Sequence, residues 1–125
     1  MIVLDACVVI AFFRADDPHA TAALEIVDTE EELYLHPLTL AECAVGPAKT
    51  GTLADFRRGV LRLGLNTWVP DDGHSYRLAI LRATTPCKLP DCCVLDTART
   101  LGARLATFDA ALAKVARAVG VEVTR

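Results

Sequence analysis

The sequence predicts an α/β fold in which a parallel sheet is covered by helices on both faces. Short runs of β-branched and other apolar residues alternate with longer stretches in which apolar residues recur at helical spacing. Strands that are joined through helices form a parallel sheet with those helices packed on its faces. The 125 residues suit one domain with a core of its own, and we expect residues 1–125 to form that single domain.

The chain begins with a predicted strand followed by two helices. Ile2–Leu4 is a short apolar run that predicts the strand. Helical apolar spacing continues over residues 8–14 and predicts the first helix. Residues 16–18 read Asp-Asp-Pro, which predicts a turn before a second helix at about residues 19–27.

The next segment predicts one strand and two helices. Leu33–Leu35 is the second candidate strand, and Pro37 ends it. A helix is predicted over residues 40–45, and we expect the Gly46-Pro47 pair to end it because an interior proline removes a helical hydrogen bond. Residues 53–63 form an amphipathic pattern, with apolar side chains on one face and arginines elsewhere.

The remainder of the chain repeats the alternation. The predicted elements are a strand at 66–69 ended by Pro70, helices at 75–83 and 91–101, a strand at 104–108, a helix at 110–118 and a closing strand at 121–124. In sheets of this kind, ligands bind outside the carboxyl ends of the strands. The edge formed by those ends is therefore where functional residues are expected.

Composition and charge exclude several classes of protein. No apolar run approaches the roughly 20 residues that span a bilayer, and the first residues lack the basic segment of a secretory signal. We therefore expect the protein to be cytoplasmic and not to associate with a membrane. The net charge of −3 argues mildly against non-specific nucleic-acid binding. Five cysteines without a CxxC pair predict buried apolar side chains rather than disulfides or zinc ligands. The three histidines are scattered, which predicts surface or loop positions.

Four carboxylates are placed near one sheet edge by these predictions. Asp5 ends the first strand, and Asp109 follows the fourth strand directly. Glu42 lies in the first turn of the helix after the second strand. Asp91 begins the helix that feeds into the fourth strand, and we expect it to reach the same edge. Asp96, five residues further on, faces away from Asp91 and is predicted to be solvated or locally paired.

Each carboxylate also has an ordinary structural explanation. Asp109 and Asp91 stand where an N-cap is expected, and Glu42 follows Thr39 at the spacing of a capping box. Asp5 is harder to explain in this way, because an acid directly after an apolar central strand is unfavourable unless it is used. Four acids crowded together would repel one another, and divalent cations would relieve that repulsion. Oxygen ligands suit Mg²⁺ or Mn²⁺.

The motifs around these acids resemble those of a known family. They are Leu4-Asp5-Ala6, Pro37-Leu38-Thr39-Leu40-Ala41-Glu42, Leu89-Pro90-Asp91 and Ala106-Thr107-Phe108-Asp109. In this order and over essentially the whole chain, they resemble the PIN domains, and in particular the VapC-type toxins of bacterial toxin–antitoxin pairs. The resemblance implies a three-layer α/β/α PIN-like fold with a central, mostly parallel sheet.

The resemblance also implies an activity and its residues. PIN domains of this type are endoribonucleases that use Mg²⁺ or Mn²⁺ to hydrolyse RNA phosphodiesters. Asp5, Asp91 and Asp109 match metal-binding positions, and Glu42 matches the acidic position that binds metal directly or through water. Thr107 matches a supporting hydroxyl position. The implied partners are an RNA substrate, a cognate VapB-like antitoxin and a second copy in a homodimer.

One departure from the family pattern leaves an alternative open. Many relatives carry Ser, Thr or Asn shortly after the first Asp, where this chain has Ala6 and Cys7. The alternative is therefore a catalytically weak PIN-fold module that binds RNA or protein. A receiver-like signalling domain would need an acid ending the third strand, where residues 69–70 read Val-Pro. Lys88 and Arg82 are weak candidates for RNA contacts.

Overall fold

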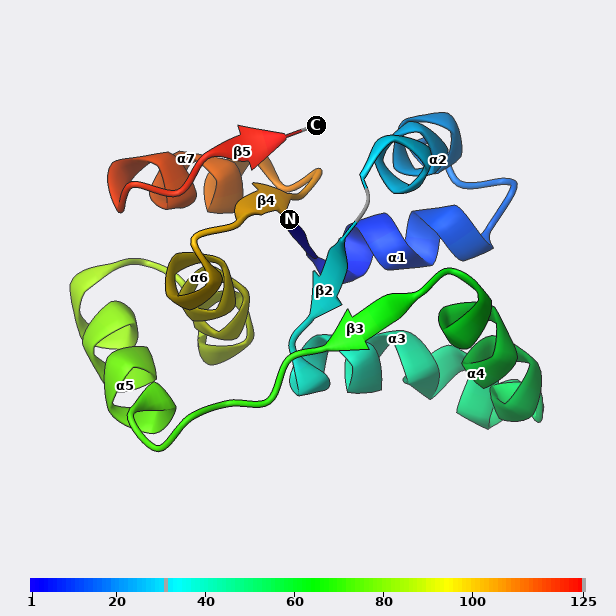
Figure 1. Ribbon diagram of the computed structural model, residues 1–125, viewed down its shortest axis with the longest axis horizontal. Helices are drawn as coiled ribbons and strands as arrows, with labels where there is room; N and C mark the ends of the chain where they lie inside the picture. The colour runs from blue at the N-terminus through cyan, green and yellow to red at the C-terminus, as the bar shows by residue number, and fades with distance from the viewer. Residues whose placement is uncertain (31, 125) are drawn as a thin grey trace.

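The computed structural model describes residues 1–30 and 32–124, and within them it forms a five-stranded sheet (Figure 1). The strand order is β3-β2-β1-β4-β5, and every neighbouring pair is parallel. The strands are β1 Ile2–Leu4, β2 Leu33–Leu35, β3 Leu65–Thr67, β4 Arg104–Ala106 and β5 Val123–Thr124. The predicted parallel sheet is thus confirmed, with the N-terminal strand at its centre.

Helices pack on both sides of this sheet, as predicted. They are α1 Ala6–Phe13, α2 Ala20–Thr29, α3 Pro37–Thr50, α4 Leu53–Arg62, α5 His74–Thr84, α6 Leu89–Leu101 and α7 Ala110–Ala118. Figure 1 shows α1 to α4 on one side of the strands and α5 to α7 on the other. Among the described residues, no helix is both long and apolar enough to span a membrane.

Side chains of the central strand enter two separate cores. Ile2 and Leu4 pack with residues of α1 to α4, whereas Val3 packs with residues of α5 to α7. Successive side chains on a strand point to opposite faces, so a strand buried on both faces is apolar throughout. This alternation divides the molecule into the three layers of an α/β/α fold.

Three predicted strands are longer than the observed ones. The third, predicted at 66–69, is β3 Leu65–Thr67, and its ladder closes with a hydrogen bond from Trp68 N–H to Leu35 O (2.8 Å). The fourth, predicted at 104–108, ends as β4 at Ala106, because Thr107 leaves the sheet with its hydroxyl turned toward Asp5. The closing strand, predicted at 121–124, is reduced to Val123–Thr124.

The prediction that Gly46-Pro47 ends a helix is wrong. Helix α3 runs from Pro37 through Pro47 to Thr50 and ends at Gly51, whose φ of 75° is left-handed. A proline ring collides with the Cβ of the preceding helical residue, and Gly46 has no Cβ. Packing of α3 against α1, α4 and α6 then offsets the lost backbone hydrogen bond.

Candidate active site

Asp5 lies at the carboxyl end of the central strand and is held from several directions. Its backbone N–H donates to Ala106 O (3.0 Å), which joins the ends of β1 and β4. Its Oδ1 accepts from Ala6 N–H (2.8 Å), so Asp5 is also the N-cap of α1. Its Oδ2 accepts from the Thr107 hydroxyl (2.8 Å) and from the Cys7 thiol (3.4 Å). Both oxygens are therefore fixed in direction.

Thr107 joins Asp5 to Asp109. Its buried hydroxyl donates to Asp5 and accepts from the backbone N–H of Asp109 (3.0 Å). Asp109 is the N-cap of α7, and its Oδ1 accepts from Ala111 N–H (2.9 Å) and Leu112 N–H (3.2 Å). The cap explanation for Asp109 is thus confirmed. Both cap bonds use Oδ1, so Asp109 Oδ2 takes no part in the cap and can serve as a ligand for a cation.

The capping-box explanation for Glu42 is wrong. The N-cap of α3 is His36, whose Nδ1 accepts from Leu38 N–H (2.9 Å), so Thr39 and Glu42 both lie inside the helix. Glu42 is an exposed residue, although its carboxylate is partly shielded from solvent. This partial burial raises the pKa of Glu42 above its ordinary value, and the negative charges of Asp5 and Asp91 raise it further.

Asp91 is likewise not an N-cap. The N-cap of α6 is Lys88, and Asp91 is the third residue of the helix. Burial raises the pKa of Asp91, the charges of Asp5 and Asp109 raise it further, and Lys88 lowers it. The charges that act on Glu42 and Asp91 thus bring all four predicted acids into one electrostatic cluster.

Cys7 occupies the position where the family pattern has a hydroxyl or amide side chain. Its thiol donates to Asp5 Oδ2 (3.4 Å) and accepts from Phe108 N–H (3.4 Å). It is half-buried, whereas the other cysteines, Cys43, Cys87, Cys92 and Cys93, are buried as predicted. Burial and the charge of Asp5 raise the pKa of the Cys7 thiol, so the neutral donor is favoured at this position.

The donor set of the cluster fits a hard divalent cation. It consists of carboxylate oxygens, which are the ligands that Mg²⁺ and Mn²⁺ prefer. Burial raises the pKa values of Glu42 and Asp91, and the charges of the other acids raise them further, so a bound cation would relieve part of that repulsion. A cleft of about 390 Å³ opens beside Glu42, between α1, α3 and α4, and Arg14 lies in its wall. Of the two candidate RNA contacts, Lys88 is near enough to Asp91 for its positive charge to lower the pKa of that acid. Arg82 is exposed on α5.

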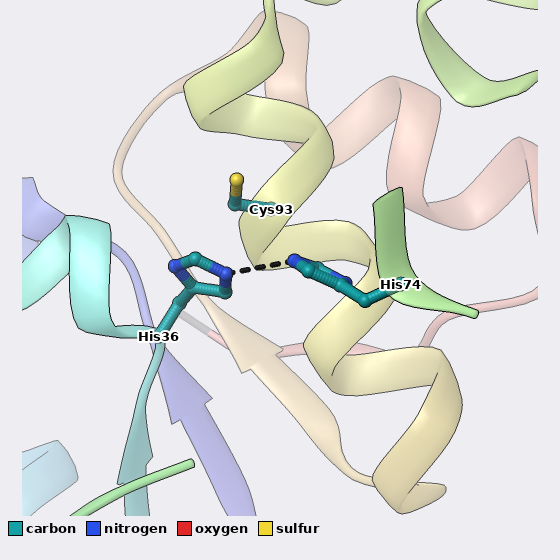
Figure 2. Close-up of side chains that lie close together, drawn as sticks. All are labelled: His36, His74 and Cys93. Carbon is teal, nitrogen blue, oxygen red and sulfur yellow. Dashed lines mark hydrogen bonds between the residues drawn. The ribbon is translucent and has the colours of Figure 1, made fainter. Parts of the chain in front are cut away.

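A second polar cluster was missed by the sequence analysis. His36 and His74 are buried, with Nε2 atoms 2.9 Å apart, and Figure 2 shows them beside Cys93. Asp96 is also buried and accepts from His74 and Arg77 rather than being solvated. Burial opposes its charge, but those hydrogen bonds leave the pKa of Asp96 below its ordinary value. Pro37 was the available signal for the position of His36, because proline favours the first residue of a helix and the residue before it is then the N-cap.

Comparison with known proteins identifies the family. The sequence matches the family model of the PIN domain over residues 2–118, and the chain belongs to that family. No curated protein matches the sequence.

Solved structures share this fold at low sequence identity. A chain of a toxin–antitoxin complex from Klebsiella pneumoniae is 23% identical, with a TM-score of 0.79 over 100% of this chain and 97% of that one. FitAcB from Neisseria gonorrhoeae is 21% identical, with a TM-score of 0.75 over 100% and 97%. VapC20 from Mycobacterium tuberculosis, described as a toxin that cleaves the sarcin–ricin loop, is 15% identical, with a TM-score of 0.79 over 100% and 99%.

Proposed function

We propose that this protein is a metal-dependent endoribonuclease toxin that a cognate antitoxin neutralises. The observation that supports the proposal is the pair of Asp5 and Asp109, which Thr107 joins just beyond the carboxyl ends of β1 and β4. Glu42 and Asp91 are near enough for the charges of these acids to act on them. Burial raises the pKa values of Glu42 and Asp91, and the charges of neighbouring acids raise them further. A fold does not need such a concentration of like charge, but a site for divalent cations does.

Each acid has a distinct part in this proposal. Asp5, Asp91 and Asp109 would hold Mg²⁺ or Mn²⁺, which when bound supplies the positive charge that polarises a phosphate oxygen. Asp5 and Asp109 cap α1 and α7, so both carboxylates lie at the positive ends of helix dipoles, where anionic groups are stabilised. Glu42 has a raised pKa and is suited to accept a proton from the water that attacks phosphorus.

Substrate and partner are proposed from the family and its structural relatives. VapC20 is described as a toxin that cleaves the sarcin–ricin loop, and the Klebsiella pneumoniae chain comes from a toxin–antitoxin complex. We extend both properties to this chain, with Lys88 and Arg82 as candidate RNA contacts and the cleft beside Glu42 as the place for an antitoxin segment. We also propose a homodimer, for which light scattering on the purified protein is the test.

The test of activity uses the substitution Glu42→Gln. Purified protein free of antitoxin should cleave a structured RNA in Mg²⁺ or Mn²⁺, and EDTA should stop it. Glu42→Gln should lower the cleavage rate roughly 100-fold or more, because the amide cannot accept a proton. Its free energy of unfolding should stay within about 0.5 kcal/mol of wild type, because Glu42 is exposed and caps nothing.

A matched control and a metal-ligand variant complete this experiment. Glu25→Gln changes an exposed glutamate on α2 and should cleave like wild type. Asp5→Asn preserves an N-cap acceptor but should abolish cleavage. RNA that is bound but not cut under any divalent cation would favour the alternative of a binding module. Full activity of Asp5→Asn would rule out the proposed metal site.

A further inference from the structure

Two histidines that are far apart in the sequence meet in the interior of the protein. His36 follows β2 and caps α3, and His74 is the first residue of α5. Each side chain belongs to a residue that is 6% exposed, and their Nε2 atoms lie 2.9 Å apart (Figure 2). A hydrogen bond between two ring nitrogens requires that one of them carries a proton and the other does not.

The neighbours of this pair fix where the protons are. Leu38 N–H donates to His36 Nδ1 (2.9 Å), so the neutral His36 ring must carry its proton on Nε2. That proton is donated to His74 Nε2, which leaves the proton of His74 on Nδ1. His74 Nδ1–H then donates to Asp96 Oδ2 (2.6 Å). A single arrangement of protons therefore satisfies the whole chain of bonds, which we call the histidine latch.

Asp96 anchors the far end of the histidine latch. It is 2% exposed, and Arg77 donates to it from Nε (2.8 Å, to Oδ1) and from Nη2 (3.0 Å, to Oδ2). Arg77 also bonds Asp71 in the segment before α5 (3.0 Å from Nη1 to Oδ2). The latch thus connects the start of α3, through α5, to the middle of α6.

Three potential metal ligands lie at the same place, but hydrogen bonding explains their arrangement better than metal binding does. His36, His74 and Cys93 offer atoms within 4.8 Å of one another. A metal on His36 Nε2 would require the ring proton on Nδ1, where Leu38 N–H already donates. Within the described part of the chain, every buried side-chain nitrogen and oxygen has a hydrogen-bond partner. The hydrogen bonds therefore leave no donor atom that needs an ion.

The two ends of the latch lie on the helices that carry two of the acids. His36 begins α3, which bears Glu42, and Asp96 lies on α6, five residues after Asp91. These two helices pack directly against each other. We propose that the histidine latch fixes α3 against α6 and so sets the spacing between Glu42 and Asp91. His36, His74 and Asp96 are then positioning residues for the acid cluster, a role that rests on the proposed function.

Two measurements test this proposal separately from nuclease activity. The first is ¹⁵N NMR of the histidine rings at neutral pH, which should find the His36 proton on Nε2 and the His74 proton on Nδ1. The opposite tautomer at either ring would overturn the latch. One equivalent of Zn²⁺ should leave both rings unchanged, and a shift of both would replace the latch with a metal site.

The second measurement is Mn²⁺ affinity in the absence of RNA. His36→Asn retains an acceptor for Leu38 N–H but is too short to reach His74, so it breaks the latch and spares the cap. We expect the Mn²⁺ affinity to fall roughly 10-fold, as when a metal site loses an outer partner. Glu25→Gln, which changes an exposed side chain on α2, is the control and should bind Mn²⁺ like wild type.

The outcomes separate this proposal from the proposed function. If wild type binds no Mn²⁺, the metal site fails and the ring tautomers alone decide the latch. If wild type binds Mn²⁺ and folded His36→Asn binds it equally well, the positioning role is wrong while the metal site stands.

Discussion

At the scale of single residues, the hydroxyl of Thr107 contacts two of the acids in the candidate site. Thr107 Oγ1 donates to Asp5 Oδ2 and accepts from Asp109 N–H, and the residue is 1% exposed. The Thr107 hydroxyl therefore orients the side chain of Asp5 and the backbone of Asp109. The sequence predicted this position only from its resemblance to the family motif, because a threonine after a strand has no chemistry of its own.

Removing that hydroxyl should affect both stability and metal binding. Thr107→Val has nearly the same shape but leaves the Asp109 N–H without its acceptor and Asp5 Oδ2 without a donor. We expect the free energy of unfolding to fall by about 1 kcal/mol, which is typical of a lost intramolecular hydrogen bond. We also expect weaker Mn²⁺ binding, measured by calorimetry, because Asp5 loses its strongest side-chain donor.

Thr97→Val is the matched control for this substitution. Thr97 is also buried, but its hydroxyl donates to Cys93 O within its own helix (2.7 Å). It should lose some stability and keep its Mn²⁺ affinity. Equal effects of the two variants on Mn²⁺ binding would mean that Thr107 acts only through the fold.

At the scale of elements, α7 separates capping from metal binding. Asp109 accepts two backbone N–H groups at the start of α7, and asparagine can do the same. Asp109→Asn should therefore keep the wild-type melting temperature and bind Mn²⁺ more weakly, because one carboxylate charge is gone. Asp109→Ala should bind Mn²⁺ equally weakly and lose about 1 kcal/mol of stability as well, measured by urea unfolding.

The two variants decide between the roles of Asp109. If Asp109→Asn binds Mn²⁺ as tightly as wild type, the residue is a cap and nothing more. If it loses stability as Asp109→Ala does, the cap depends on the charge rather than on the acceptor.

The elements that the sequence predicted best are those defined by local pattern. The apolar run of β1 and the periodicity of α4 are local, and the edge rule then placed Asp5 and Asp109 together. The path of α3 through Pro47 could not be predicted in this way, because contacts with other helices decide it. His36 and His74 were predicted at surface or loop positions, and their burial was missed for the same reason: His36 and His74 are 38 residues apart, and His74 and Asp96 are 22 residues apart.

At the scale of the whole molecule, ionisable groups act on stability in opposite directions. Burial and the charge of His74 lower the pKa of His36 to about 4, although Asp96 opposes this. The unfolded chain binds this proton near pH 6.5, so acid favours the unfolded state. The raised pKa values of Glu42 and Asp91 act the other way, because the folded protein takes up their protons more readily as the pH falls.

Because these effects oppose one another, the pH dependence of wild-type stability alone does not reveal the contribution of His36. The difference in stability between wild type and His36→Asn does. His36 should contribute stability that is complete above pH 6.5 and is lost as the pH falls toward 4, amounting to about 3 kcal/mol for its shift. Glu42 and Asp91 are present in both wild type and His36→Asn, so their contributions largely cancel. The difference in unfolding free energy, measured by urea titration from pH 7 to pH 4, should therefore shrink as acid is added. If the two curves of unfolding free energy against pH are parallel, His36 keeps an ordinary pKa in the folded protein, and its burial does not make folding sensitive to acid.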